Sequence, residues 1–193
     1  MTYRIPPLSP VLPCIRRSAF APLLAITMLG FAACSSTTHF VRAETVAEAP
    51  VLDPAARVYV TLPEDGVFED KAQKASGAKT QQAVVDALQE HAAVITGTTV
   101  ESQDDALASA RRDSCTHVLI PEVRHWEDRA TEWSGRRDVL IVGLRLFDAA
   151  SAALLDEVVI DGRSSRWTFG GDHPEDLLHG PLEAYAASIF GDG

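Results

Sequence analysis

Two tryptophans lie among charged residues in the segment His125-Trp-Glu-Asp-Arg-Ala-Thr-Glu-Trp-Ser-Gly135. Tryptophan and arginine are enriched at binding hot spots, because they combine a large contact area with hydrogen-bonding groups. The segment therefore has the composition of a surface that docks a partner. The candidate contact residues are Trp126, Glu127, Asp128, Arg129 and Trp133. The alternative interpretation is that both indole rings cover one edge of the core while the charges are solvated.

The flanking sequence predicts that this segment is the arm of a β-hairpin. Residues 118–120 and 139–142 are continuously apolar, as is typical of strands covered on both faces. After Pro121 the chain becomes charged and aromatic, and Ser134-Gly135 favours a turn. We therefore expect the arm to leave the core with both indoles partly exposed.

The histidines do not have the spacing of a metal site. His117, His125, His173 and His179 lie near acids, but the chain contains neither an H-E-x-x-H motif nor paired cysteines. It also lacks the G-x-S-x-G turn of serine hydrolases. We therefore expect no metal and no cofactor, and the sequence favours a protein that is not an enzyme. The alternative is a hydrolase that acts on cell-wall material through a carboxylate or histidine.

A second polar segment, Trp167-Thr-Phe-Gly-Gly-Asp-His-Pro-Glu-Asp176, precedes the last helix. Proline suits the first position of a helix, so a helix is expected to begin at Pro174 with Asp172 or His173 as its cap. A phosphate-binding loop is disfavoured, because no Lys followed by Ser or Thr opens the helix.

The first 33 residues have the three parts of a signal peptide. Arg16-Arg17 end a basic region, and an uncharged stretch interrupted by Pro22 follows, too short to span a bilayer comfortably. Phe31-Ala-Ala-Cys34 resembles the lipobox of bacterial lipoproteins, although Phe31 replaces the usual Leu, Val or Ile. The resemblance implies cleavage before Cys34 and lipid on that cysteine, which attaches the protein permanently to a membrane. Ser35 stands where an inner-membrane retention signal would have Asp, which favours the outer membrane, facing the periplasm.

Charge and cysteine content limit what the mature chain can do. Without residues 1–33 it has 14 Lys and Arg against 27 Asp and Glu, a formal charge of −13. Such a surface repels phosphate backbones, which excludes nucleic acid as the expected partner. Cys115 is the only cysteine after Cys34, so no internal disulfide can form, and we expect a buried, inert thiol.

The pattern of apolar residues predicts one domain of 57–193 after a flexible tether at 34–56, rich in Ser, Thr, Ala and Glu. The expected strands are residues 57–62, 94–100, 115–120, 139–147 and 154–160, and the second of these is interrupted at Gly97. The expected helices are residues 78–91, a helix that starts at Ser102, and residues 174–190, which are expected to be interrupted at Gly180-Pro181. The order β-α-β-α-β-β-β-α predicts a two-layer α/β domain with a mixed sheet and helices packed on it.

The two polar segments, 125–135 and 167–178, also look like markers of a family of bacterial lipoproteins of unknown function. The resemblance covers most of 57–190 and implies no activity. More loosely, the order of elements is similar to that of the amino-terminal domain of TolB and of LpoB-type activators, a likeness of fold that does not transfer function. The leading hypothesis is an envelope lipoprotein that docks onto another envelope protein.

Overall fold

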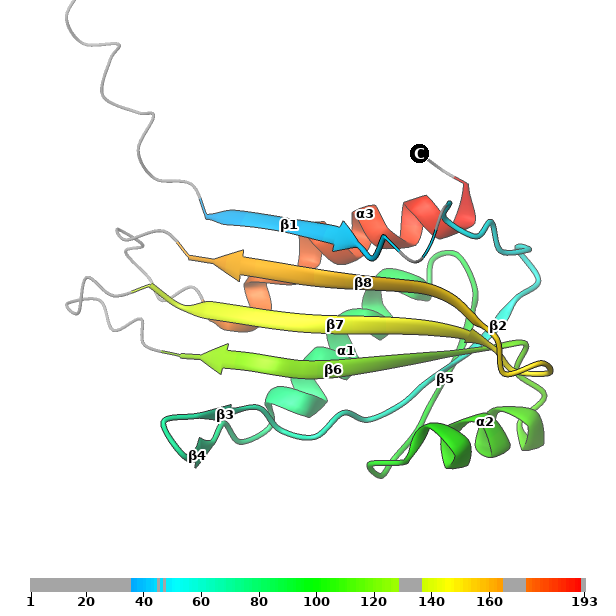
Figure 1. Cartoon of the computed structure of the whole chain (residues 1–193), viewed down its shortest axis with the longest axis horizontal. Helices are drawn as coiled ribbons and strands as arrows, with labels where there is room; N and C mark the ends of the chain where they lie inside the picture. The colour runs from blue at the N-terminus through cyan, green and yellow to red at the C-terminus, as the bar shows by residue number, and fades with distance from the viewer. Residues whose placement is uncertain (1–35, 45, 47, 129–136, 165–172, 192–193) are drawn as a thin grey trace, which may run out of the picture. The chain divides into compact units, whose positions relative to one another are not determined.

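A six-stranded mixed sheet forms the centre of the domain (Figure 1). The computed structural model describes residues 36–44, 46, 48–128, 137–164 and 173–191. In spatial order the strands are β1 (Thr37–Arg42), β8 (Leu154–Arg163), β7 (Val139–Asp148), β6 (His117–Glu127), β2 (Arg57–Val60) and β5 (Ala93–Thr96). A small hairpin, β3 (Val67–Phe68) and β4 (Lys71–Ala72), forms a separate two-stranded sheet that packs beside β6. The helices are α1 (Ser76–Leu88), α2 (Gln103–Arg112), the 3-10 turn η1 (Pro174–Leu177) and α3 (His179–Phe190).

The two halves of the sheet are connected in different ways. Strand β2 pairs in parallel with β5 and with β6, and α1 and α2 make the crossovers between these strands. Strands β6, β7 and β8 are antiparallel, and β1 adds antiparallel to β8. Short turns give antiparallel neighbours and helical crossovers give parallel ones. The predicted mixed-sheet α/β domain is therefore confirmed.

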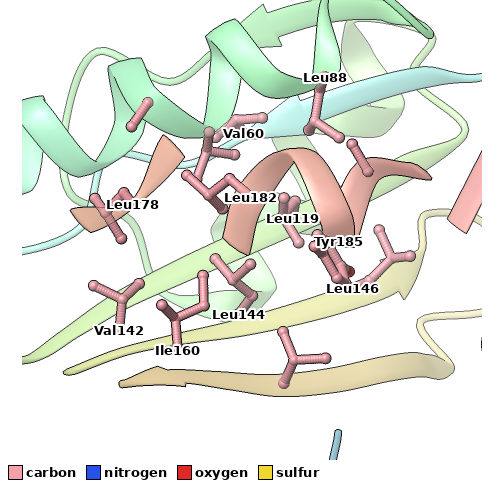
Figure 2. Close-up of a cluster of buried hydrophobic side chains, with 14 of the residues drawn as sticks. Val60, Leu88, Leu119, Val142, Leu144, Leu146, Ile160, Leu178, Leu182 and Tyr185 are labelled. Carbon is pink, nitrogen blue, oxygen red and sulfur yellow. The ribbon is translucent and has the colours of Figure 1, made fainter. Parts of the chain in front are cut away.

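Helices α1 and α3 pack on one face of the sheet over the main core (Figure 2). Every second residue of β7 faces this core, because side chains alternate across a strand. Leu140, Val142, Leu144 and Leu146 are all fully buried there. From the helices, Leu88, Leu182 and Tyr185 fill the space above them. On the opposite face, α2 covers a smaller cluster beside β2 and β6.

Helix α2 begins where the sequence predicts, because the signal is local. The Ser102 hydroxyl accepts a hydrogen bond from the backbone N–H of Asp105 at 3.2 Å, which satisfies one free amide of the first turn. Asp104 and Asp105 lie in the first turn, and two arginines lie in the last, so both ends complement the helix dipole.

The predicted tether is wrong for residues 37–42. They form β1, which pairs with β8 from Thr37 opposite Arg163 to Arg42 opposite Val158. Their alternating burial shows the period of two of a half-covered strand. The folded domain therefore starts about 20 residues earlier than expected, at the edge strand of the sheet.

Strand β6 is longer than predicted and runs through Pro121. The carbonyl of Leu119 accepts from the N–H of Thr61 on the side of β2. Backbone groups alternate sides along a strand, so Pro121 also faces that side, where β2 has ended and no N–H is required. Proline is tolerated at such a free edge, and the strand continues to Glu127.

Two other expectations differ in detail. Strand β5 ends at Thr96, so residues 98–100 are not part of a strand. The last helical region is interrupted at Leu178 rather than at Gly180-Pro181, which lie in the first turn of α3. Proline is compatible with a first turn, because the N–H that it lacks has no partner within the helix there.

Candidate docking surface

The predicted contact residues Trp126, Glu127 and Asp128 lie at the end of β6, while Arg129 and Trp133 lie outside the described residues. Trp126 stands opposite Leu140 of β7, and it is only 3% exposed, within the main core. The expectation of a partly exposed indole is therefore wrong for Trp126. A register shift between Val123 and His125 puts the indole on the helix-covered face, and no local sequence pattern indicates that shift.

Glu127 and Asp128 take part in polar contacts that join the two polar segments of the sequence. The His125 Nε2 atom lies 3.1 Å from the Glu127 carboxylate, and the ring of Phe68 packs edge-on against His125. Asp128 lies 4.0 Å from the Nδ1 atom of His173. His173 is the N-cap residue of η1 and its N–H donates to Asp176 at 2.9 Å, which confirms the predicted cap. Asp172 lies outside the described residues.

On the face of the sheet opposite α1 and α3, no described helix covers the side chains of β1, β7 and β8. On this side α2 contacts β2 and β6. We call this surface the open face. The register brings His39, Asp161, Ile141 and His125 into one row across four strands. The next row contains Val41, which is 57% exposed, and Val159. The open face consists of His39, Val41, Arg124, His125, Ile141, Arg145, Glu157, Val159, Asp161 and Arg163.

Gly143 makes room for an arginine that crosses this face. A Cβ atom at Gly143 would lie 2.9 Å from the guanidinium of Arg124. Arg124 contacts Glu122 at 2.9 Å on its own strand and Glu157 at 3.8 Å on β8. Neither residue stands out in the sequence, because only the strand register brings Gly143 beneath Arg124. The open face thus holds paired charges between apolar side chains.

A groove of about 430 Å³ lies where the parallel strands end. Its walls come from the chain after β2 and β5 and from β6, at the place where open α/β sheets commonly hold ligands. Two of its carboxylates already accept hydrogen bonds. Asp65 accepts from the backbone of Gly77, and Glu101 accepts from the hydroxyls of Tyr59 and Ser109. Burial and the bond to Glu101 raise the pKa of Tyr59 to about 12, so this hydroxyl is a poor acid or base near neutrality.

A second groove of about 450 Å³ lies between α1 and α3. It is lined by His91, His179 and three carboxylates, but the described lining residues include no hydroxyl or thiol nucleophile. His91 instead stacks on Phe190 with 5.2 Å between ring centroids. In the described part of the chain, no three His, Cys, Asp or Glu side chains come together as a metal site.

Two further titratable groups are Cys115, which is buried, and His117, which is half-buried. Cys115 is 7% exposed, and burial raises the pKa of its thiol, which confirms the predicted buried cysteine. Burial lowers the pKa of His117, whose Nδ1 atom lies 2.8 Å from the Thr116 hydroxyl. Neither group faces a cavity with a reaction partner among the described residues.

The fold and this surface define a small α/β domain with one uncovered sheet face and no recognisable catalytic centre among its described residues. Residues 51–189 match the model of a domain of unknown function, DUF4823, so the chain belongs to that family. This confirms that the family is one of unknown function, and that its members are bacterial lipoproteins stays a prediction. No curated protein matches the sequence.

Similar solved structures come from bacteria. The PelC dodecamer from Paraburkholderia phytofirmans has a TM-score of 0.57 at 17% identity, with 80% of this chain and 96% of that chain covered. Protein XCC0632 from Xanthomonas campestris, of family DUF330, has a TM-score of 0.45 at 10% identity, with 76% and 94% covered. Lipoprotein GNA1162 from Neisseria meningitidis has a TM-score of 0.44 at 12% identity, with 72% and 99% covered.

These likenesses concern the fold alone, since the identities are low. The looser similarity to TolB and LpoB-type domains stays a prediction. None of the described helices is both long enough and apolar enough to cross a membrane.

Proposed function

We propose that this chain is a lipid-anchored lipoprotein of the cell envelope that acts without catalysis, by binding another envelope protein through its open face. The observation that carries the proposal is the uncovered sheet surface around Val41, Val159 and Ile141. A six-stranded sheet with helices over one side usually buries its other side as well or exposes it to solvent as a polar surface. Here apolar residues alternate with ion pairs, as at non-obligate interfaces.

The anchor in this proposal is Cys34, and the location is the outer membrane with the domain in the periplasm. The support is the lipobox-like Phe31-Ala-Ala-Cys34 and the Ser35 that follows it. Replacement of Cys34 by Ser is expected to abolish lipid labelling and to block cleavage of the leader. Labelling that persists in this variant would contradict the anchor, because Cys14 precedes the basic pair and has no apolar segment before it.

Binding is favoured over catalysis by what the two grooves contain. Hydrolysis needs a nucleophile or an activated water next to an acid or base with a suitable pKa. The groove between α1 and α3 offers imidazoles and carboxylates that can act on a water, but no hydroxyl or thiol nucleophile is among its described lining residues. In the groove at the end of β2, Glu101 and Asp65 already accept hydrogen bonds. A hydrolase that activates a water in the groove between α1 and α3 is the alternative function.

The partner is either a different envelope protein or a second copy of the chain. PelC shares the fold and is a dodecamer in its solved structure, so self-assembly is a relevant alternative for the identity of the partner. The acidic domain excludes nucleic acid as the expected partner.

Site-specific photo-cross-linking in intact envelopes tests the proposal. A photoreactive residue at Val41 on the open face is expected to give a discrete cross-linked product whose mass identifies the partner. The matched control is the same residue at Gln82, which is exposed on α1 on the other side of the sheet. A product from Gln82 but none from Val41 would place the partner on the helical side and contradict the proposal. Products from neither position would contradict binding altogether.

A further inference from the structure

The folded domain begins almost at the proposed lipid anchor. Only Ser35 and Ser36 separate Cys34 from Thr37, the first residue of β1. Strand β1 is a fixed part of the sheet, since all six of its residues pair with β8 and the next N–H, that of Ala43, donates to Glu157 at 2.8 Å. The side chain of Arg42 is held by two hydrogen bonds to Asp156.

The length of this link restricts where the domain can be. Three peptide steps span at most about 11 Å, so Thr37 must stay within that distance of Cys34. A free tether over 34–56 would have allowed a root-mean-square distance of roughly 25 Å, and considerably more when extended. A diacylated cysteine lies at the membrane interface, which places the start of β1 at the headgroups as well.

The start of β1 is one corner of a larger surface. The register aligns Thr37 with Arg163, Val139 and Glu127, so β8 ends, β7 begins and β6 ends at the same edge (Figure 1). We call this edge the anchor end and define it by Thr37, Asp128, Arg137 and Arg163, which are all exposed. The turn between β7 and β8, residues 149–153, lies at the opposite end, about 30 Å away by the rise of a ten-residue strand.

We propose that the anchor end rests on the phospholipid headgroups, so that the strands stand on the membrane and the β7–β8 turn points away from it. This proposal rests on the lipid anchor of the proposed function. Besides the short link, it is supported by the two exposed arginines, Arg137 and Arg163, because the domain as a whole is acidic and basic side chains are attracted to anionic lipid surfaces. The open face then stands upright beside the membrane, accessible from the periplasm.

Quenching by spin-labelled headgroups distinguishes this orientation from a loosely tethered domain. The mature lipidated protein, with Cys115→Ala to leave one reactive thiol, is reconstituted in vesicles of phosphatidylethanolamine and phosphatidylglycerol that contain a headgroup nitroxide lipid. A fluorophore is attached either at Asp128→Cys on the anchor end or at Ala150→Cys in the distant turn. Asp128 directly follows β6, three strands away from β1, so it reports on the whole edge rather than on the link.

The fluorophore at position 128 is expected to lose most of its emission, and the one at position 150 is expected to keep nearly all of it. A flexible glycine–serine insert between Ser36 and Thr37 should remove this difference while the protein still floats with the vesicles. Equal quenching at both positions with the native link would overturn the orientation and leave the anchor intact. Failure of the processed chain to float with vesicles would overturn the anchor and the orientation together.

Discussion

Arg42 of β1 and Asp156 of β8 form a bidentate ion pair, with 2.8 Å between Nε and Oδ1 and 3.0 Å between Nη2 and Oδ2. The Asp156 side chain is fully buried, whereas that of Arg42 is 22% exposed. The same Nη2 atom donates to the Ser188 hydroxyl of α3 at 3.1 Å. The pair therefore joins the edge strand, its neighbour and the last helix.

Replacement of Arg42 by Met is expected to lower the free energy of unfolding by about 3 kcal/mol, because it leaves the buried carboxylate of Asp156 without its counter-charge. The matched control is Arg163→Met, which removes an exposed arginine whose contact with Asp161 is 3.6 Å long. Exposed pairs contribute about 1 kcal/mol or less. Urea denaturation measures both variants, and similar losses would show that the Arg42 pair is no more stabilising than a surface contact.

Truncation tests whether β1 belongs to the domain. A chain that starts at Ser36 should unfold cooperatively, and neither a chelator nor a reductant should change its melting temperature, because Cys115 is the only cysteine in it. A chain that starts at Arg57 loses β1, which exposes the edge of β8 and isolates Asp156. We expect it to melt at a lower temperature and to aggregate. Equal melting temperatures of the two chains would mean that β1 contributes little.

Two helical glycines should respond to alanine in opposite directions. A Cβ atom on Gly77 would clash with the carbonyl oxygen of Pro63, so the backbone must shift, and Gly77→Ala should destabilise by about 1–3 kcal/mol. A Cβ atom on Gly180 would meet nothing within 4 Å. Gly180→Ala should stabilise by roughly 0.5 kcal/mol, because alanine loses less backbone entropy in a helix. Thermal melts measure the stability of both variants. A Gly77→Ala variant that is more stable than the native protein would refute the close contact with Pro63.

Tyrosine ionisation provides a test at alkaline pH. The pKa of Tyr59 is raised from 10.0 to about 12, first by burial and then by the hydrogen bond to Glu101, and burial also raises the pKa of Tyr185. A raised pKa stabilises the fold below the unfolded value, and this contribution is lost as the pH rises from about 10 through 12. Ultraviolet titration of the mature domain should show no tyrosinate until the pH is well above 10. Glu101→Gln should move the ionisation of Tyr59 to lower pH, and an unchanged curve would exclude the role of Glu101.

The two tryptophans of the first polar segment can be separated by mutation. Trp126→Ala empties a buried aromatic site and should cost about 3–5 kcal/mol. For Trp133 the docking prediction is that Trp133→Ala leaves the melting curve nearly unchanged and removes a cross-linked partner from envelopes. If Trp133→Ala is strongly destabilised, Trp133 covers the core and is not part of the docking surface.

Elements whose signals lie within one segment were predictable from the sequence. The cap at Ser102 and the alternating or continuously apolar strands β7 and β8 depend on neighbouring residues, and the structure has them near the expected positions. Pro121 was a misleading local signal, because its effect depends on whether β2 continues beside it. Only the arrangement of the whole sheet decides that.

The edge strand and the open face could not be predicted in the same way. The burial of residues 37–42 alternates as in a strand. Their pairing partner, however, lies more than 100 residues later, and the residues that follow them have the composition of a linker. The contact of Arg124 with Glu157 across Gly143 likewise requires the register of three strands. Among the predicted contact residues, Trp126 lies on the helix-covered face of the sheet, and not at the surface as expected, because of one register shift in β6.

The pairing of β1 with β8 also orders the steps of folding. Arg42 and Asp156 are 114 residues apart, so β1 acquires its native neighbour only after most of the chain has been made. Closing so long a loop is slow compared with forming the adjacent hairpin of β7 and β8. The strand nearest the start of the domain is therefore expected to be among the last to join the sheet.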